Sequence, residues 1–337
     1  MKNIKSDAGL LTLAVRLVLG WTYFSAFWRR VVIANKLDPE APGYIGEKFN
    51  NFLPNALGIK PLIQYLVENP DLLWINMVIF TIVEAIAGLL IIFGLFTRLM
   101  SIVIFGLALG VLLGAGWIGT TCLDEWQIGV LGIASGFVLF LTGSGKYSLD
   151  NYLISKDVSI TKQKWFSWLG SGILPMKESI FPKFVLIGSL VIFGFTLMTN
   201  QIYHGGVWGT LHNKSVKPKL EITEGVFQNN QLSFDVYRVE GVDVYGSWTI
   251  GIELTDEQNN TVLEYNQDDL AAFNEQDIDN YFVAKIKPGK HSLVIPLGAK
   301  ANITLRDPVL SGLNSGQYTL RITDISGAYW EHQIEKN

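Results

Sequence analysis

Long apolar runs occupy the first 200 residues of the chain, and short alternating runs occupy the last 130. A membrane-spanning helix needs about 20 predominantly apolar residues. Five runs reach or approach that length: 9–28, 72–94, 99–118, 126–143 and 184–200. From Val216 onward, apolar positions alternate with polar ones, which is typical of strands with one buried face. The pattern therefore predicts membrane helices followed by a β domain.

The alternating runs of the C-terminal part predict an antiparallel β-sandwich of roughly seven strands. The strands recognised in the pattern are 220–227, 231–239, 247–254, 261–266, 291–297 and 318–324. Turns are expected at Asn229-Asn230, Gln258-Asn259-Asn260 and Lys287-Pro288-Gly289. The predicted fold class is a membrane α-helical bundle of four helices plus a fifth anchoring helix, followed by an extracytoplasmic antiparallel β-sandwich.

The basic residues orient the helices. With the N-terminus in the cytoplasm, the inner segments carry nine lysine and arginine residues and the outer loops carry five, which follows the positive-inside rule. The predicted domains are a four-helix transmembrane domain at 1–155, a cytoplasmic amphipathic linker at 156–183, a fifth transmembrane helix at 184–200 and an extracytoplasmic β domain at 201–337. The protein is thus expected in the cell membrane as a multi-pass protein. A plain linker is the alternative for the amphipathic segment.

The composition supports this division and excludes several kinds of site. The chain is 49% apolar and 17% charged, whereas soluble domains carry about 25% charged residues. A formal net charge of −4 suggests no nucleic-acid partner. A single cysteine excludes an internal disulfide and a dithiol relay within the chain.

Two charges lie well inside the predicted spans, Arg16 and Glu84. Intramembrane charges are costly and usually face the bundle interior or a cavity. Counted from the outer ends of their helices, both residues are expected about 18 Å below the outer surface. Equal depth predicts a pair, which either fixes the helix register or serves a proton or quinone path.

The one cysteine lies in a short polar loop, GTTCLDEWQIG (119–129), between the third and fourth predicted helices. A lone cysteine is most often an inert small hydrophobe, but Cys122 lies in an outer loop rather than in an apolar run. A reactive thiolate needs nearby positive charge, and Arg29 and Arg30 are predicted at the same membrane face. Asp124 and Glu125 are candidates for proton transfer or for capping the fourth helix.

A second polar segment, NQIYHGGVWGTLHN (200–213), follows the fifth predicted helix. His204 and His212 can exchange protons near neutral pH, although a glycine-rich hinge is the alternative for this segment. His204 and Trp208 are candidates for binding the substrate. Trp126, expected in the aromatic belt, is grouped with Arg16 and Glu84 as a candidate for the quinone or proton path.

These motifs resemble those of a known family. Residues 9–155, which contain TTCLDEWQIGVLGIASG, resemble DoxD. Residues 184–335, which contain YHGGVWGTLHN and SGQYTLRITDISGAYW, resemble DoxA. DoxD and DoxA are the two subunits of membrane-bound thiosulfate:quinone oxidoreductase, and here they are expected to be fused in one polypeptide.

The resemblance implies that thiosulfate is oxidised to tetrathionate and that two electrons reduce a membrane quinone. The sequence shows no haem, flavin or metal motif, so electrons are expected to pass from the sulfur directly to the quinone that the resemblance implies, or through a cofactor that the sequence does not reveal. The hypothesis is that Cys122 carries a thiosulfate-derived group as a mixed S–S adduct. Arg29, Arg30 and His204 would hold the anions, and Asp124, Glu125 or Glu84 would transfer protons. The lipid bilayer is the remaining partner, and a homo-oligomer is left open.

Three other functions remain at this point. One is a different quinone-linked sulfur or thiol oxidoreductase on the same scaffold. Another is a non-enzymatic membrane anchor whose outer β-sandwich binds a ligand or a partner. A transporter of small sulfur anions is the third, although five spans without evident inverted repeats give it little support.

Overall fold

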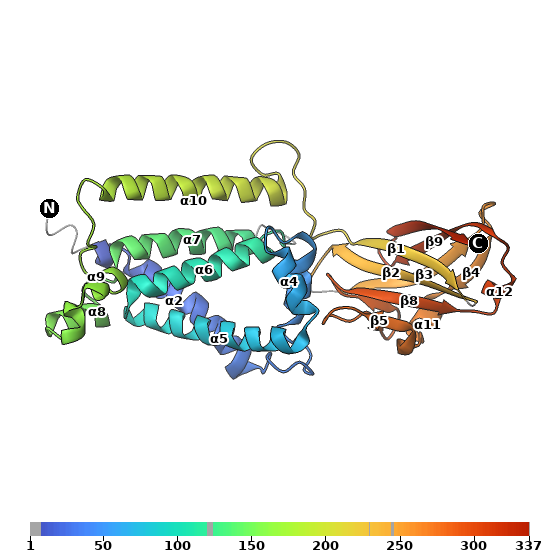
Figure 1. Cartoon of the computed structure of the whole chain (residues 1–337), viewed down its shortest axis with the longest axis horizontal. Coiled ribbons are helices and arrows are strands. Elements are labelled where there is room, and N and C mark those ends of the chain that lie inside the picture. The colour runs from blue at the N-terminus through green and yellow to red at the C-terminus, as the bar shows by residue number, and fades with distance from the viewer. Residues whose placement is uncertain (1–7, 120–123, 229, 244–245, 337) are drawn as a thin grey trace. The chain divides into compact units, whose positions relative to one another are not determined.

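The computed structural model describes residues 8–119, 124–228, 230–243 and 246–336. The chain divides into two compact units (Figure 1). Unit 1 comprises residues within Met1–Ile45, Trp74–Gly116 and Leu123–His212. Unit 2 comprises residues within Gly46–Leu73, Trp117–Cys122 and Asn213–Asn337.

Unit 1 is helical. Its long helices are α2 (Leu13–Phe27), α5 (Pro70–Phe93), α6 (Thr97–Ala115), α7 (Asp124–Thr142) and α10 (Phe181–His204). The short elements α8 (Leu149–Ser155), η3 (Ser159–Lys162) and α9 (Lys164–Leu169) gather at one end of the helices (Figure 1). Among the described residues, α5, α6, α10 and residues 125–142 of α7 are long and apolar enough to cross a membrane. Together with the β domain, they confirm the predicted fold class.

The helix predicted at 9–28 is interrupted at Thr12 and continues beyond residue 28. Residues 8–11 are helical, Thr12 is a turn residue, and α2 itself has 15 residues. Beyond Phe27 the helix continues as the π-helical segment η1, Trp28–Ile33. Arg29 and Arg30 are therefore part of this helical course, whereas the sequence placed them in an outer loop.

Small residues bring the helices of unit 1 close together. A Cβ at Gly88 would lie 2.5 Å from the backbone nitrogen of Phe24, so α5 and α2 are in backbone contact there. A Cβ at Gly132 would lie 2.7 Å from that of Ala108, so α7 approaches α6 equally closely. Close packing at small residues is how membrane helices associate without a hydrophobic driving force. α10 lies beside α7 (Figure 1), and the rings of Phe184 and Phe137 are 5.9 Å apart.

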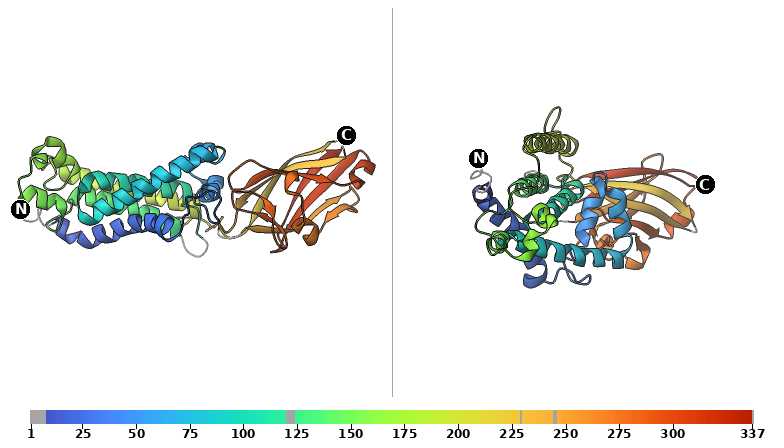
Figure 2. Two further views of the ribbon diagram at one scale, coloured as in Figure 1. Left: turned by 90° about the horizontal axis from the view of Figure 1, so that it is seen from below. Right: turned by 60° about the vertical axis from the view of Figure 1, so that its left-hand side comes forward.

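Unit 2 is built on two antiparallel sheets. One has the strand order β1-β2-β8-β5, and the other has the order β10-β9-β3-β7-β6 with β4 paired to β3. The strands are β1 (Lys219–Gln228), β2 (Gln231–Glu240), β3 (Ser247–Thr255), β4 (Thr261–Tyr265), β5 (Ile278–Asn280), β6 (Lys287–Pro288), β7 (Leu293–Ile295), β8 (Lys300–Arg306), β9 (Gly316–Asp324) and β10 (Tyr329–Lys336). Figure 2 shows the sheets from two further directions.

The alternating pattern explains the core of unit 2. Leu232, Phe234 and Val236 of β2 are fully buried, and they belong to a cluster that also receives Leu254 of β3 and Leu320 of β9. Because successive side chains of a strand point to opposite faces, these alternate apolar residues meet between the sheets. Short helices complete the domain: α11 (Gln267–Ala271), η4 (Glu275–Asp277) and α12 (Val309–Gly312).

Residues 46–73, which extend into the first turn of α5, pack on the β domain as part of unit 2. They form α3 (Glu47–Phe52), η2 (Leu53–Asn55) and α4 (Lys60–Val67). The fully buried Asn50 amide donates to the Gly298 carbonyl at 3.1 Å and accepts from the Ala284 N–H at 3.0 Å. Gly298 has φ +74°, and a Cβ there would lie 1.7 Å from the Asn50 carbonyl oxygen. Glycine is required at this position by both conformation and space.

Candidate functional site

An ion pair lies among the apolar side chains of unit 1. Arg30 donates from Nη1 to Glu84 Oε2 at 2.7 Å and to Thr81 Oγ1 at 2.7 Å. The side chains of Arg30 and Glu84 are only 13% and 7% exposed. The Thr81 hydroxyl donates to the Met77 carbonyl, and the Arg30 guanidinium lies 5.8 Å from the centre of the Phe80 ring. The segment η1 thus presents a cation to the carboxylate of α5.

Tyr23 places a phenol in the apolar core of the same helices. It is buried in the cluster that holds Leu19, Ile91 and Ile104. A Cβ at Gly132 would lie 3.0 Å from its hydroxyl oxygen, so the Tyr23 hydroxyl lies against α7. The sequence analysis did not select Tyr23. The sequence signal for Tyr23 is its position seven residues before Arg30, because residues seven apart lie on the same face of a helix after two turns.

The predicted pair between Arg16 and Glu84 is wrong. Arg16 lies in the first turn of α2, is 2% exposed, and donates to the carbonyls of Ser144 and Tyr147, each at 2.6 Å. The depth estimate took residue 28 as the outer end of the helix, but the helix continues to Ile33. Arg30, which was assigned to substrate binding, is therefore the partner of Glu84.

A second polar cluster joins the ends of α6, α7 and α10. His204, which is 1% exposed, makes a 2.9 Å hydrogen bond from Nε2 to the Gly116 carbonyl. That bond assigns the proton to Nε2. His204 Nδ1 has no hydrogen-bond partner among the described residues. Tyr203 donates to the carbonyls of Leu112 and Leu113, and Trp126 Nε1 donates to Thr199 Oγ1 at 3.0 Å.

The residues before the thiol loop are held by the end of the second motif. Asn213 Nδ2 donates to the Gly119 carbonyl at 2.6 Å, and Ser215 Oγ accepts from the Gly119 N–H at 3.0 Å. Residues 120–123, and with them Cys122, lie outside the described part of the chain. The segment from Thr199 to Ser215 therefore contacts the chain on both sides of this loop, at Gly116 and Gly119 before it and at Trp126 after it.

The remaining candidates are distributed around these clusters. Asp124 begins α7 and Glu125 follows it. Trp208 is exposed, and its backbone N–H donates to Gln201 Oε1 at 3.0 Å. Arg29 is exposed on η1 and acts electrostatically on Glu84. His204 and Arg30 have different partners, Gly116 and Glu84, so each belongs to its own cluster.

Two family models match the chain. Residues 11–177 match the model described as TQO small subunit DoxD. Residues 203–333 match the model described as TQO small subunit DoxA. The first match ends beyond α9 and the second begins at Tyr203, so nearly all of α10 lies between them. Both quoted motifs, around Cys122 and around His204, fall within the matched regions.

Proposed function

The chain fuses a DoxD and a DoxA region of thiosulfate:quinone oxidoreductase in one polypeptide, and from this premise we propose that it oxidises thiosulfate to tetrathionate and transfers the two electrons to a membrane quinone. Membership of these families makes it a quinone-linked sulfur oxidoreductase of the membrane. The overall change consumes two thiosulfate ions, one quinone and two protons. It yields one tetrathionate ion and one quinol.

One observation carries the proposal. Hydrogen bonds from His204 and Asn213 of the DoxA motif reach Gly116 and Gly119, which lie shortly before the DoxD thiol loop in the chain. Fusion alone would not require that, because two regions can share a polypeptide without sharing a site. The contacts support a reaction centre at the thiol loop to which both regions contribute.

The proposed sulfur chemistry has two steps. The Cys122 thiolate and the sulfane sulfur of one thiosulfate form an S–S bond, and the two electrons released reduce the quinone, which also takes up two protons. The sulfane sulfur of a second thiosulfate then attacks the sulfane sulfur of the adduct. Tetrathionate forms, and Cys122 leaves as the thiolate. Only the cysteine is required by these steps, so it is the residue whose loss the mechanism does not tolerate.

The other candidate side chains have supporting roles in this proposal. Arg29 and the exposed indole of Trp208 attract the thiosulfate dianion, since cations and N–H donors bind oxyanions. His204 accepts a proton at Nδ1, because its Nε2 is engaged by Gly116. Asp124 and Glu125 transfer protons at the start of α7.

We propose that the quinone is reduced at a site formed by Glu84, Arg30 and Tyr23. A carboxylate and a phenol among apolar side chains suit a ring whose carbonyl oxygens must be protonated after reduction. Thr81 and Arg30 fix the Glu84 carboxylate in place. Arg16 is not included in this path, since its guanidinium donates to two backbone carbonyls. Trp126 instead ties α7 to α10 through Thr199.

The proposed topology keeps the N-terminus in the cytoplasm and residues 201–337 outside. It supplies thiosulfate from the extracytoplasmic side, where the thiol loop would lie. The proposed domain limits remain 1–155, 156–183, 184–200 and 201–337. The match to DoxD, which reaches residue 177, supports treating the linker with the first helices.

The test is an assay of the purified full-length protein in detergent with thiosulfate and a short-chain quinone. We expect quinone reduction with one tetrathionate formed per quinol. If sulfide, sulfite or low-molecular-weight thiols drive quinone reduction and thiosulfate does not, the enzyme class stands and the assigned substrate changes. Failure of every sulfur donor to reduce the quinone would contradict the proposal and favour a non-enzymatic membrane anchor.

A further inference from the structure

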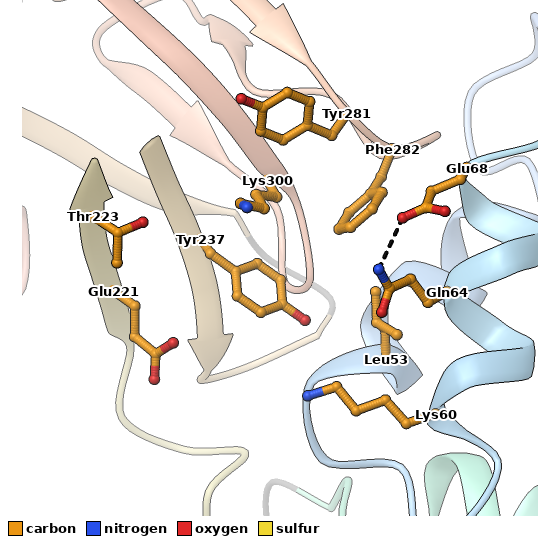
Figure 3. Close-up of a pocket in the computed structure, with 10 residues that line it drawn as sticks. All are labelled: Leu53, Lys60, Gln64, Glu68, Glu221, Thr223, Tyr237, Tyr281, Phe282 and Lys300. Atoms are coloured by element: carbon orange, nitrogen blue, oxygen red, sulfur yellow. Dashed lines mark hydrogen bonds between the residues drawn. The ribbon is translucent and has the colours of Figure 1, made fainter. Parts of the chain in front are cut away.

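A cavity of about 620 Å³ lies within unit 2 (Figure 3). Its size falls within the range of small-molecule sites. One wall is the outer face of the sheet β1-β2-β8-β5, and the other is α4 with the preceding Leu53. Every residue that lines it belongs to unit 2, so the cavity is a property of the extramembrane part of the chain.

A row of polar side chains covers the sheet wall. Glu221 of β1 pairs with Tyr237 of β2, which pairs with Lys300 of β8. Their neighbours along each strand, such as Ile222 and Val236, point into the core. Because successive residues alternate between faces, the row lies on the side of the sheet away from the core.

The helical wall carries a matching stripe. Lys60, Gln64 and Glu68 are spaced four residues apart along α4 and its C-cap, which places them on one face of the helix. Figure 3 shows the Tyr237 hydroxyl and the Lys60 ammonium directed into the space between the two walls. Two polar faces that oppose each other in this way do not pack together, and they leave room for a polar ligand.

The charges that face the cavity are of both signs. Lys300 is neutralised by Asp235 at 3.1 Å. Lys60 donates to the Pro54 carbonyl, and Glu68 accepts from the Gln64 amide. Among the described residues, both charged side chains therefore have neutral hydrogen-bond partners. Glu221 adds a second carboxylate, with Lys219 at 4.0 Å. This balance disfavours a simple anion and suits a ligand that carries one charge of each sign.

Aromatic rings supply the remaining chemistry. Tyr237 and Phe282 meet edge to face at 6.4 Å, and both line the cavity. Such rings attract alkylammonium groups through their faces. Burial, followed by the nearby Glu221 charge, raises the pKa of Tyr237. The phenol therefore stays protonated and can donate to an acceptor oxygen.

The chain places this cavity beside the membrane. α4 ends at Val67 and the membrane helix α5 begins at Pro70, so Glu68 lies two residues before it. On the other side of α4, Leu62 and Tyr65 are exposed. An aliphatic and an aromatic side chain on a helix next to a membrane span are typical of residues that contact the lipid interface.

From these observations we propose that the cavity binds the head group of a zwitterionic phospholipid. Lys60 and the Tyr237 hydroxyl take the phosphate, and Glu68 with the Phe282 ring takes the ammonium. The lipid would tie the β domain to the bilayer surface through α4. This inference does not rest on thiosulfate oxidation, and either could fail while the other held.

The experiment uses the full-length protein in nanodiscs of equal parts phosphatidylethanolamine and phosphatidylglycerol. Native mass spectrometry then counts the lipids retained after release from the disc. We expect retained phosphatidylethanolamine to exceed phosphatidylglycerol. Glu68→Gln should lower that preference roughly tenfold, since it removes a charged partner of the ammonium that only phosphatidylethanolamine carries. Lys60→Gln should lower the retention of both lipids, because both carry the phosphate, and Tyr237→Phe, which keeps the ring, should lower it less.

Two substitutions of the same kind away from the cavity are the controls. Lys290→Gln and Glu264→Gln change exposed side chains of unit 2 that do not line it, and they should leave the preference unchanged. A preference for phosphatidylglycerol, or a preference for phosphatidylethanolamine that survives Glu68→Gln in folded protein, would overturn the proposal. Unchanged retention of both lipids by Lys60→Gln would overturn it as well. Binding of soluble glycerophosphoethanolamine without retention of the lipid would overturn the assignment to a membrane lipid.

Discussion

Two buried arginines of unit 1 have different partners. Arg98, at the start of α6, is fully buried and donates to four backbone carbonyls, those of Phe140, Ser167, Gly170 and Gly172. Arg30 instead pairs with the Glu84 carboxylate. The carbonyls cannot change protonation state, whereas a carboxylate can. A charge among membrane helices therefore indicates function only when its partner can titrate or bind a ligand.

The surroundings of Arg98 reinforce the contrast. Nearby Asp150 is also fully buried, and it accepts hydrogen bonds from the backbone of Phe96 and Thr97 and from the hydroxyls of Thr97 and Ser171. These bonds join the α5–α6 turn, α8 and the segment after α9. We interpret this network as a clamp at one end of the bundle. The Arg30–Glu84 pair instead has the Thr81 hydroxyl as its further hydrogen-bond partner.

The largest expected effect is on stability, at the clamp. Arg98→Met leaves four buried carbonyls without their donor and should lower the free energy of unfolding by about 3–5 kcal/mol. Thermal unfolding of the purified protein in detergent measures this loss. Activity per folded molecule should stay near that of the wild type. An unchanged melting temperature would show that the clamp does not hold the helix ends.

The next effect is on activity, at the ion pair. Glu84→Gln should lower kcat about a hundredfold, because a positioned proton carrier is removed. It also leaves Arg30 as a buried charge without its counterion, so the melting temperature should fall. The double variant Arg30→Gln/Glu84→Gln removes both charges and should recover stability but not activity. Recovery of both would reduce the pair to a structural role.

A smaller effect is expected at Tyr23. Tyr23→Phe keeps the ring within its cluster and removes the hydroxyl that lies against Gly132. We expect kcat for quinone reduction to fall about tenfold, because one hydrogen bond to a reacting group is lost. The melting temperature should change little. A comparison of quinones that differ only in ring substituents measures the change in kcat. An unchanged rate with all of them would remove Tyr23 from the site.

The smallest effect is expected at an exposed ion pair. Lys162 and Asp157 lie 2.7 Å apart in the segment between α8 and α9, and their side chains are 57% and 79% exposed. Pairs of this kind contribute at most about 1 kcal/mol. Lys162→Ala should therefore change neither the melting temperature nor the activity by a measurable amount. A large loss of either would contradict the view that an exposed ion pair contributes less to stability and activity than the buried arginines do.

Part of this picture could be predicted from the sequence. Glu84 was recognisable because a carboxylate in an apolar run of that length is rare. Six strands were recognisable from their alternation. β8 was missed although Ala301, Ile303 and Leu305 alternate with polar residues. β10 shows a weaker signal, since Ile334 is its only fully buried residue among those described.

Other features depend on contacts that no local pattern records. The partner of Glu84 was misassigned because η1 extends the first helix past a pair of arginines that looked like a loop. Asn50 contacts Gly298 across 248 residues of chain, so the packing of residues 46–73 on the β domain had no local signal. Arg98 was counted only as one of the nine basic residues of the inner segments, although it donates to four carbonyls from distant parts of the chain.

The central claim is that Cys122 carries the sulfur during turnover. Cys122 lies outside the described residues, so chemistry rather than geometry must test it. The most direct measurement is mass spectrometry of the Cys122 peptide after thiosulfate and quinone are supplied, together with the activity of Cys122→Ser. We predict an added thiosulfate-derived group on Cys122 of the wild type and no thiosulfate-dependent quinone reduction by the variant. Full activity of Cys122→Ser would contradict the account.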